Sequence, residues 1–268
     1  MGRIQIALNK AREAAKAKAE AGNDGAAAQA VVVRRPDLFI QAREVALEPR
    51  TLHANRIRGI QSSDPGAAAY KMLRTRVLHR MRSHGWHKLA VTSPRANAGK
   101  TLTSINLAIS LAHEPNQEVI LVDLDLRNPR VGRYLGLDPE FGLGDHLTRD
   151  VPIEKVLLKP NISRLYVIPS AERLENSSEL LASPQIGVFT QMLVSTSPST
   201  IVIFDLPPLL EADDMLTFMP QVDAVLFVVA QGETRQVDLE KSNELFKDLN
   251  LLGTVLNKSG DEAPADYY

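Results

Sequence analysis

Cysteine is absent from this 268-residue sequence. Its absence excludes a disulfide-stabilised fold, a thiol nucleophile and cysteine-ligated zinc or iron–sulfur sites, and it is compatible with a reducing cytoplasm. No apolar run approaches the ~18 residues of a membrane-spanning helix. The N-terminus also lacks the apolar core of a secretory signal. The sequence therefore predicts a soluble, cytoplasmic protein.

Charge of one sign is also lacking overall, because the net charge is −1. A uniformly basic nucleic-acid binder is excluded, and we expect no specific nucleic-acid partner. The charge is unevenly distributed: residues 1–90 hold 17 basic and 7 acidic side chains, whereas residues 91–268 hold 14 and 25. The basic N-terminal third is either a solvated arm or a surface for an anionic membrane or an acidic partner.

The chain divides into three parts by composition. Residues 1–65 begin with an amphipathic helix over 4–19 and continue, from about residue 21, as a basic linker that we expect to be largely disordered, with at most short ordered pieces. Residues 66–258 carry the periodic patterns of one large domain. Residues 259–268 have no apolar pattern and are expected to form a flexible tail.

Short apolar runs alternate with helical patterns through this domain. Strands are expected at 88–92, 119–122, 165–168, 200–204, 223–230 and 253–256, and helices at 67–81, 100–112, 177–182, 185–196 and 235–249. Strands that are apolar throughout and separated by helices are typical of a parallel sheet covered on both faces. The predicted fold class is therefore α/β, with a mostly parallel, doubly wound sheet, preceded by a flexible helical arm.

The strongest chemical signal is the segment 93–101, Ser-Pro-Arg-Ala-Asn-Ala-Gly-Lys-Thr, between a strand and a helix. Backbone amides at such a helix start bind phosphate, Lys100 would reach the β- and γ-phosphates of a nucleotide, and the Thr101 hydroxyl would bind Mg²⁺. A capped helix start with an exposed lysine is the alternative. Pro94 and Asn97 stand where such loops often have glycine, and asparagine tolerates the positive φ that glycine would supply. The predicted nucleotide-binding residues are Arg95, Ala96, Asn97, Ala98, Gly99, Lys100, Thr101 and Leu102.

Three aspartates follow two other apolar strands. Asp123 and Asp125 lie just after one strand, and Asp205, before Pro207 and Pro208, ends another. Ligands bind at the carboxyl edge of an open α/β sheet. One carboxylate of the first pair would accept a proton from a hydroxyl nucleophile and the other would hold Mg²⁺, while Asp205 would be a further Mg²⁺ acid. Solvated loop acids are the alternative for each aspartate taken alone.

Together these motifs resemble the bacterial tyrosine kinases of capsular and exopolysaccharide biosynthesis, which belong to the same P-loop NTPase-like group as the MinD/ParA ATPases. The resemblance covers about residues 67–268 and includes Asp-Leu-Asp-Leu-Arg-Asn-Pro at 123–129, Asp-Leu-Pro-Pro at 205–208 and Asn257. It implies ATP and Mg²⁺ as cofactors, Lys100, Asp123 and Asp125 as catalytic residues, and Thr101, Asp125 and Asp205 around the metal. Asn257 would lie near the adenine.

The same resemblance implies what the protein acts on and with. The phosphoacceptors would be Tyr267 and Tyr268 in the tail, modified between neighbouring subunits. The activator would be the cytoplasmic segment of a membrane chain-length regulator, which would hold the protein at the inner face of the membrane. The family's ring-forming Glu-x-x-Arg-x-x-Arg pattern is incomplete here, with Ala68, Lys71 and Arg74 at those positions. Self-association is expected, but not a ring built on that pattern.

Two other functions stay open at this point. A MinD/ParA-type ATPase has the pattern Lys-Gly-Gly-x-x-Lys in the phosphate loop. At the first three of these positions this chain has Arg95, Ala96 and Asn97. A nucleotide-binding scaffold with weak or no catalysis is the third class, because the loop and the pattern around Asp205 depart from those of the family. ATP hydrolysis without tyrosine phosphorylation would favour the MinD/ParA-type ATPase, and ATP binding without turnover would favour the scaffold.

Overall fold

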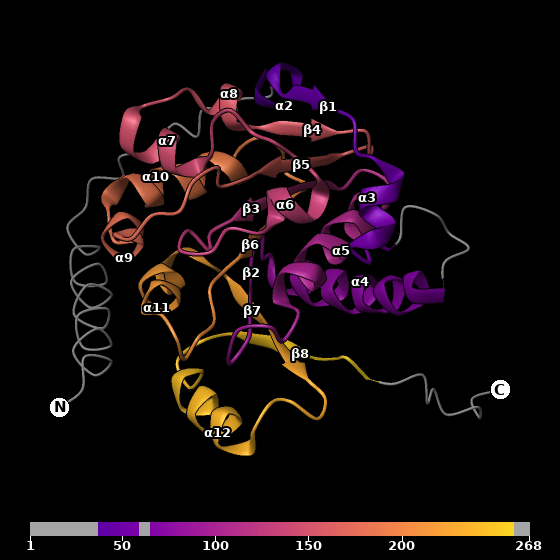
Figure 1. Ribbon diagram of the computed structural model, residues 1–268, viewed down its shortest axis with the longest axis vertical. Helices are drawn as coiled ribbons and strands as arrows, with labels where there is room; N and C mark the ends of the chain where they lie inside the picture. Colours follow the sequence, from indigo (N-terminus) through magenta and orange to yellow (C-terminus); the bar gives the residue numbers. More distant parts are fainter. Residues whose placement is uncertain (1–36, 59–64, 260–268) are drawn as a thin grey trace.

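The computed structural model describes residues 37–58 and 65–259, which build a single eight-stranded sheet (Figure 1). The strand order is β1-β4-β5-β3-β6-β2-β7-β8, and every adjacent pair is parallel except β4 and β5. The strands are β1 (Arg43–Val45), β2 (Lys88–Thr92), β3 (Glu118–Asp123), β4 (Leu158–Pro160), β5 (Leu165–Ile168), β6 (Thr200–Asp205), β7 (Ala224–Ala230) and β8 (Leu251–Asn257). The predicted mostly parallel α/β sheet is confirmed.

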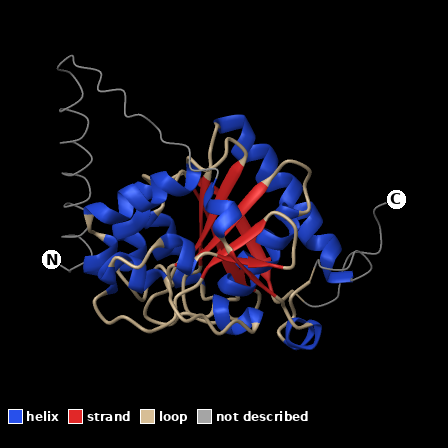
Figure 2. Cartoon of the chain, turned by 90° about the horizontal axis from the view of Figure 1, so that it is seen from above, coloured by secondary structure: helices blue, strands red, loops and turns tan. Residues whose placement is uncertain are grey.

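Helices cover both faces of this sheet (Figure 2). They are α2 (Asp37–Gln41), α3 (Pro49–Ala54), α4 (Pro65–His84), α5 (Lys100–Ala112), α6 (Val131–Leu135), α7 (Leu143–Arg149), α8 (Ile153–Val156), α9 (Ser177–Leu181), α10 (Pro184–Val194), α11 (Asp214–Phe218) and α12 (Gln236–Leu245), with a 3₁₀ turn at Met219–Gln221. One core contains residues of α3 to α6, and the other contains residues of α2 and α7 to α12. No helix in these described ranges is long and apolar enough to cross a membrane.

The central strands are apolar throughout because each serves both cores. In β2, Leu89 and Val91 pack in the core beneath α4 and α5, whereas Ala90 between them packs in the core on the opposite face. Successive side chains of a strand point to opposite faces, so a strand covered on both sides needs apolar residues at every position. This is why the continuous runs in the sequence predicted the sheet.

Residues 37–58 are ordered pieces within the segment expected to be a largely disordered linker. They form α2, β1 and α3, and β1 pairs in parallel with β4, Arg43 opposite Leu158. A strand of three residues is too short to show an alternating pattern, so its place in the sheet depends on a partner more than 100 residues away. The helix expected over 4–19 and the tail at 260–268 lie outside the described residues.

Most predicted elements agree with the structure to within a few residues, and α4 ends before Gly85 as expected, where φ is +66°. The short helices α6 and α11 were not predicted. They matter here because α6 follows β3 and α11 follows β6, and the loops before them lie at the same edge of the sheet. The sheet order places β6 between β3 and β2, so the chain segments that follow these three strands meet at one place.

Candidate nucleotide-binding site

The loop between β2 and α5 is shaped by two residues in the left-handed region. Asn97 has φ +66° and Gly99 has φ +94°. The positive φ expected for asparagine at position 97 is confirmed, since its short polar side chain tolerates this conformation. A Cβ atom on Gly99 would lie 2.0 Å from Nδ2 of Asn257, so glycine is required by space as well as by conformation.

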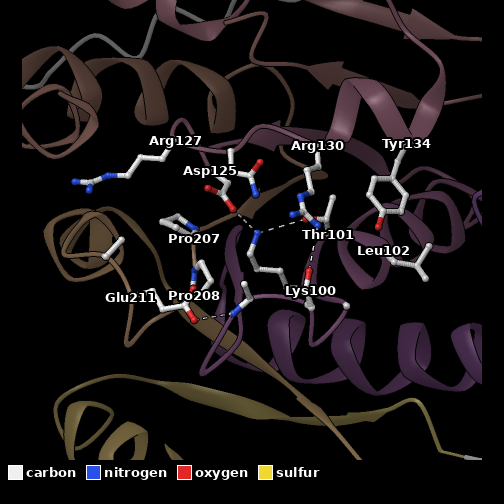
Figure 3. A pocket seen from close by; sticks show the side chains of 15 residues that line it. Lys100, Thr101, Leu102, Asp125, Arg127, Arg130, Tyr134, Pro207, Pro208 and Glu211 are labelled. Carbon is white, nitrogen blue, oxygen red and sulfur yellow. Dashed lines mark hydrogen bonds and ion pairs between the residues drawn. The ribbon is translucent and has the colours of Figure 1, made fainter. Parts of the chain in front are cut away.

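A cavity of about 240 Å³ opens above this loop (Figure 3). Its floor includes Lys100 and Thr101, one wall comes from the segment after β3, and the opposite wall comes from the segment after β6. The lining residues are Ala96, Asn97, Gly99, Lys100, Thr101, Leu102, Asp125, Arg127, Asn128, Arg130, Tyr134, Pro207, Pro208, Glu211 and Ala212. Loop, lysine, threonine and one carboxylate of the Asp123–Asp125 pair thus meet as the sequence predicted.

Lys100 is buried between two carboxylates. Its Nζ lies 2.7 Å from Oδ2 of Asp125 and 3.8 Å from Oδ2 of Asp205. Burial alone would lower the pKa of Lys100, but Asp205 and Asp125 outweigh it, and the pKa is raised above its ordinary value. The lysine is therefore a permanent positive charge at the base of the cavity.

Asp205 connects the sheet to the start of α5. Its carboxylate is fully buried and accepts hydrogen bonds from the hydroxyls of Thr101, at 2.6 Å, and Ser104, at 3.0 Å. Burial raises the pKa of Asp205, while Lys100 and the two hydroxyls act in the opposite direction. The acid and the hydroxyl that the sequence assigns to a metal site are thus in direct contact.

Asp123 lies behind the cavity and does not line it. It is fully buried and its Oδ2 accepts hydrogen bonds from the backbone amides of Arg130, at 3.0 Å, and Val131, at 2.9 Å. Its Oδ1 accepts the backbone amide of Asp125 at 3.3 Å. Burial, together with the nearby Asp205, raises the pKa of Asp123 to about 8. In this structure Asp123 holds the turn that carries Asp125.

The raised pKa of Asp123 predicts how stability depends on pH when nucleotide and magnesium are absent. Between its ordinary value of 3.8 and about 8, the folded protein keeps a proton that the unfolded chain has lost. Stability should therefore decrease as the pH rises through this window. Scanning fluorimetry of the wild type and of Asp123→Asn checks this, and the variant should show the shallower decrease. Equal slopes for the two proteins would contradict the prediction.

Two residues expected at the nucleotide have other contacts. The Arg95 guanidinium forms two hydrogen bonds of 2.9 Å to Asp238 of α12, which also pairs with Arg235 at 2.9 Å, and these two arginines hold the pKa of Asp238 well below its usual range. Arg95 and Ala98 line a separate cavity of about 140 Å³ on that side of the loop. Nδ2 of Asn257 donates to the carbonyl oxygen of Ala98 at 2.8 Å. Both side chains thus brace the phosphate loop from outside the main cavity.

Several residues of the cavity walls were not predicted from the sequence. Arg127, Arg130 and Tyr134 come from the segment after β3, and Glu211 comes from the segment after β6 and accepts the backbone amide of Ala96 at 3.2 Å. The arginine at 127 belongs to the Asp-Leu-Asp-Leu-Arg pattern and had a signal in the sequence. The others had none, since only the turns after β3 and β6 bring them to the cavity.

The donor set of the cavity floor fits a magnesium ion. In the part of the chain that the structure describes, no three acidic or histidine side chains lie close enough together to hold a metal alone. Magnesium, however, usually takes one or two carboxylates and completes its shell with water and substrate phosphates. Thr101 and Asp125 at the cavity floor, and Asp205 bonded directly behind Thr101, offer hard oxygen ligands of this kind.

Comparison with known proteins finds a matching domain family and several tyrosine-protein kinases as relatives. Residues 87–259 match the model of the family described as "AAA domain". The chain is 27% identical to the tyrosine-protein kinase YwqD of Bacillus subtilis over 78% of its own length and 83% of that protein. It is 31% identical to the tyrosine-protein kinase CpsD of Streptococcus pneumoniae over 63% of its own length and 75% of that protein. It spans only 27% of the length of the tyrosine-protein kinase ptk of Acinetobacter johnsonii.

Solved structures of a tyrosine kinase domain and of a MinD ATPase have a similar fold. The kinase domain of the Escherichia coli tyrosine kinase ETK superposes with a TM-score of 0.68 at 25% identity, over 77% of this chain and 80% of that domain. The cell division ATPase MinD of Pyrococcus furiosus has a TM-score of 0.55 at 24% identity, over 65% of this chain and 73% of that protein, and shares the fold. The chain belongs to the AAA domain family and, within it, to the bacterial tyrosine-protein kinases.

Proposed function

We propose that this protein is an ATP- and Mg²⁺-dependent protein-tyrosine autokinase that phosphorylates Tyr267 and Tyr268 of its own tail. The observation that carries the proposal is the charged cluster at the floor of the cavity and directly beneath it. There Lys100 lies between Asp125, which lines the cavity, and the buried Asp205, to which Thr101 donates a hydrogen bond. Phosphoryl transfer requires positioning and charge stabilisation of this kind. The named kinases among its relatives support tyrosine as the acceptor.

Each residue of the floor has a proposed part in the reaction. The Lys100 ammonium would leave Asp125 for the β- and γ-phosphate oxygens. Thr101 and Asp205 would hold a magnesium ion, which would supply positive charge to the phosphates. The phenol oxygen attacks the γ-phosphorus, the bond to the β–γ bridging oxygen breaks, and ADP departs. Asp125, once released by Lys100, faces the cavity and is placed to accept the phenolic proton. Asp123 would act by positioning Asp125.

The regulatory setting is also part of the proposal. The protein would work at the inner face of the membrane with the cytoplasmic segment of a chain-length regulator, and its phosphorylation would control the length and export of a polysaccharide. Trans-phosphorylation needs self-association. Ala68 and Lys71 of α4 are exposed, but Arg74 pairs with Glu114 of its own chain at 2.9 Å, which does not support the family's ring contact.

Purified full-length protein incubated with Mg-ATP tests the proposal, with and without the regulator's cytoplasmic segment. Phosphotyrosine should appear, and mass spectrometry should place it on residues 267 and 268. The double variant Tyr267→Phe/Tyr268→Phe is the matched control and should lose the signal. Absence of phosphotyrosine under both conditions would contradict the proposed autokinase activity. Repeated ATP hydrolysis alone would then indicate a MinD-type ATPase, and ATP binding without turnover a scaffold.

A further inference from the structure

One side of the cavity is basic, and the three arginines in its wall or beside it, Arg127, Arg130 and Arg173, are called the basic rim. Arg127 and Arg130 line the cavity, and Arg173 donates a 3.2 Å hydrogen bond to the side chain of Asn128, which also lines it. All three come from the chain that follows β3 and β5, on the side of the cavity that holds Asp125. Anionic groups entering beside Asp125 therefore meet guanidinium groups.

Only part of this positive charge is already balanced. Arg127 contacts the carboxylates of Asp213, at 3.3 Å, and Asp214, at 3.0 Å, and its guanidinium is directed away from Lys100 in Figure 3. Among residues 37–58 and 65–259, the side chain of Arg130 has one hydrogen-bond contact only, a weak one of 3.5 Å to the amide oxygen of Asn97. Within the described residues, neither Arg130 nor Arg173 has a carboxylate at ion-pair distance. Arg130 is thus a half-buried cation in the cavity wall whose guanidinium is available to pair with an anionic ligand.

The acceptor segment of this chain carries the matching charge. Residues 259–268 contain Asp261, Glu262 and Asp266 and no basic residue, and Asp266 directly precedes Tyr267. Neighbouring Cα atoms are ~3.8 Å apart, so a tyrosine whose phenol reaches Asp125 places the preceding carboxylate within reach of the same wall. Resting on the proposed function, we infer that Arg130 is a specificity-determining residue that binds the carboxylate of Asp266, immediately before the acceptor Tyr267.

A peptide assay tests this pairing. The enzyme is the full chain carrying Tyr267→Phe and Tyr268→Phe. The substrates are the peptide of residues 259–268 with Tyr268→Phe, in which Tyr267 is the acceptor, and the Asp266→Asn form of that peptide. Arg130→Gln should lower kcat/KM for the peptide that keeps Asp266 about tenfold, as expected for loss of one charge-assisted hydrogen bond. The Asp266→Asn peptide should lose a similar factor, and combining both changes should add little. The matched control is Arg133→Gln, an exposed arginine of α6 outside the cavity, which should leave kcat/KM unchanged.

The main rival is that Arg130 binds a phosphate of the nucleotide. In that case Arg130→Gln would raise the KM for ATP and affect both peptides equally, which would overturn the inference while the kinase proposal stands. If the enzyme that keeps Arg130 shows equal kcat/KM for the two peptides, the inference is overturned as well.

A binding measurement separates this inference from the proposed function. Fluorescence anisotropy with the labelled 259–268 peptide and the same full-length variants needs no phosphoryl transfer. Kd should increase about tenfold with Arg130→Gln, and also with the Asp266→Asn peptide, and should rise with salt. If no phosphate is transferred but this order of affinities holds, the kinase proposal fails and the acidic recognition stands. If the wild-type chain does not bind the peptide at all, the recognition fails.

Discussion

Replacing Lys100 by methionine should strongly reduce tail phosphorylation and also destabilise the fold. Loss of a positive charge aimed at the transferring phosphate should lower kcat by about 10²–10³-fold, judged by the removal of single stabilising groups in other active sites. Removing one partner of a buried ion pair leaves the other uncompensated, and Asp125 and Asp205 would lose their common counter-charge. The expected decrease in the free energy of unfolding is about 3 kcal/mol near neutral pH.

The pH dependence of this effect identifies its cause. Lys100 lowers the pKa of Asp205 and of Asp123, so without it these two carboxyls should be protonated more readily in the folded state. The stability lost at pH 8 should therefore be partly recovered at pH 6. Urea unfolding of the wild type and of Lys100→Met at both pH values measures this difference in the free energy of unfolding. Lys159→Met is the matched control, because Lys159 pairs with Glu44 on the surface with side chains 38% and 80% exposed. It should change stability little. A Lys100→Met protein as stable as the wild type at pH 8 would contradict the electrostatic account.

Gly99→Ala should distort the phosphate loop and weaken nucleotide binding. The backbone at this position has φ +94°, and the new Cβ would lie 2.0 Å from Nδ2 of Asn257. Asn257 must then move and release the carbonyl oxygen of Ala98, which it contacts at 2.8 Å. The left-handed conformation and the lost hydrogen bond together should cost about 2–3 kcal/mol of stability. Thermal unfolding and ATP titration measure the two effects.

A second glycine separates conformational strain from the clash. Gly85 has φ +66°, and a Cβ there would meet nothing within 4 Å. Gly85→Ala should therefore show the conformational cost alone, about 1 kcal/mol. Adding Asn257→Ala to Gly99→Ala should relieve the clash and leave this same smaller cost of strain, together with the missing brace. If Gly99→Ala is no worse than Gly85→Ala, Asn257 does not constrain the loop.

The sequence alone determined the class of the fold and the chemistry of the cavity floor. Strands apolar at every position require cover on both faces, and the pattern from Asn97 to Thr101 between a strand and a helix carries its own local geometry. Three aspartates after strands mark the carboxyl edge of a parallel sheet. These signals are local in the chain, so they can be read without knowing which strands are neighbours.

Only the tertiary structure decided which of these groups face the ligand. Asp123 and Asp125 are two residues apart, yet Asp123 is turned to the amides of Arg130 and Val131, and only Asp125 lines the cavity. The structure also placed β1 at the edge of the sheet and turned Arg95 toward Asp238. Asn257 contacts Ala98 across 159 positions of sequence. Such contacts depend on the order of the strands, and no local pattern encodes that order.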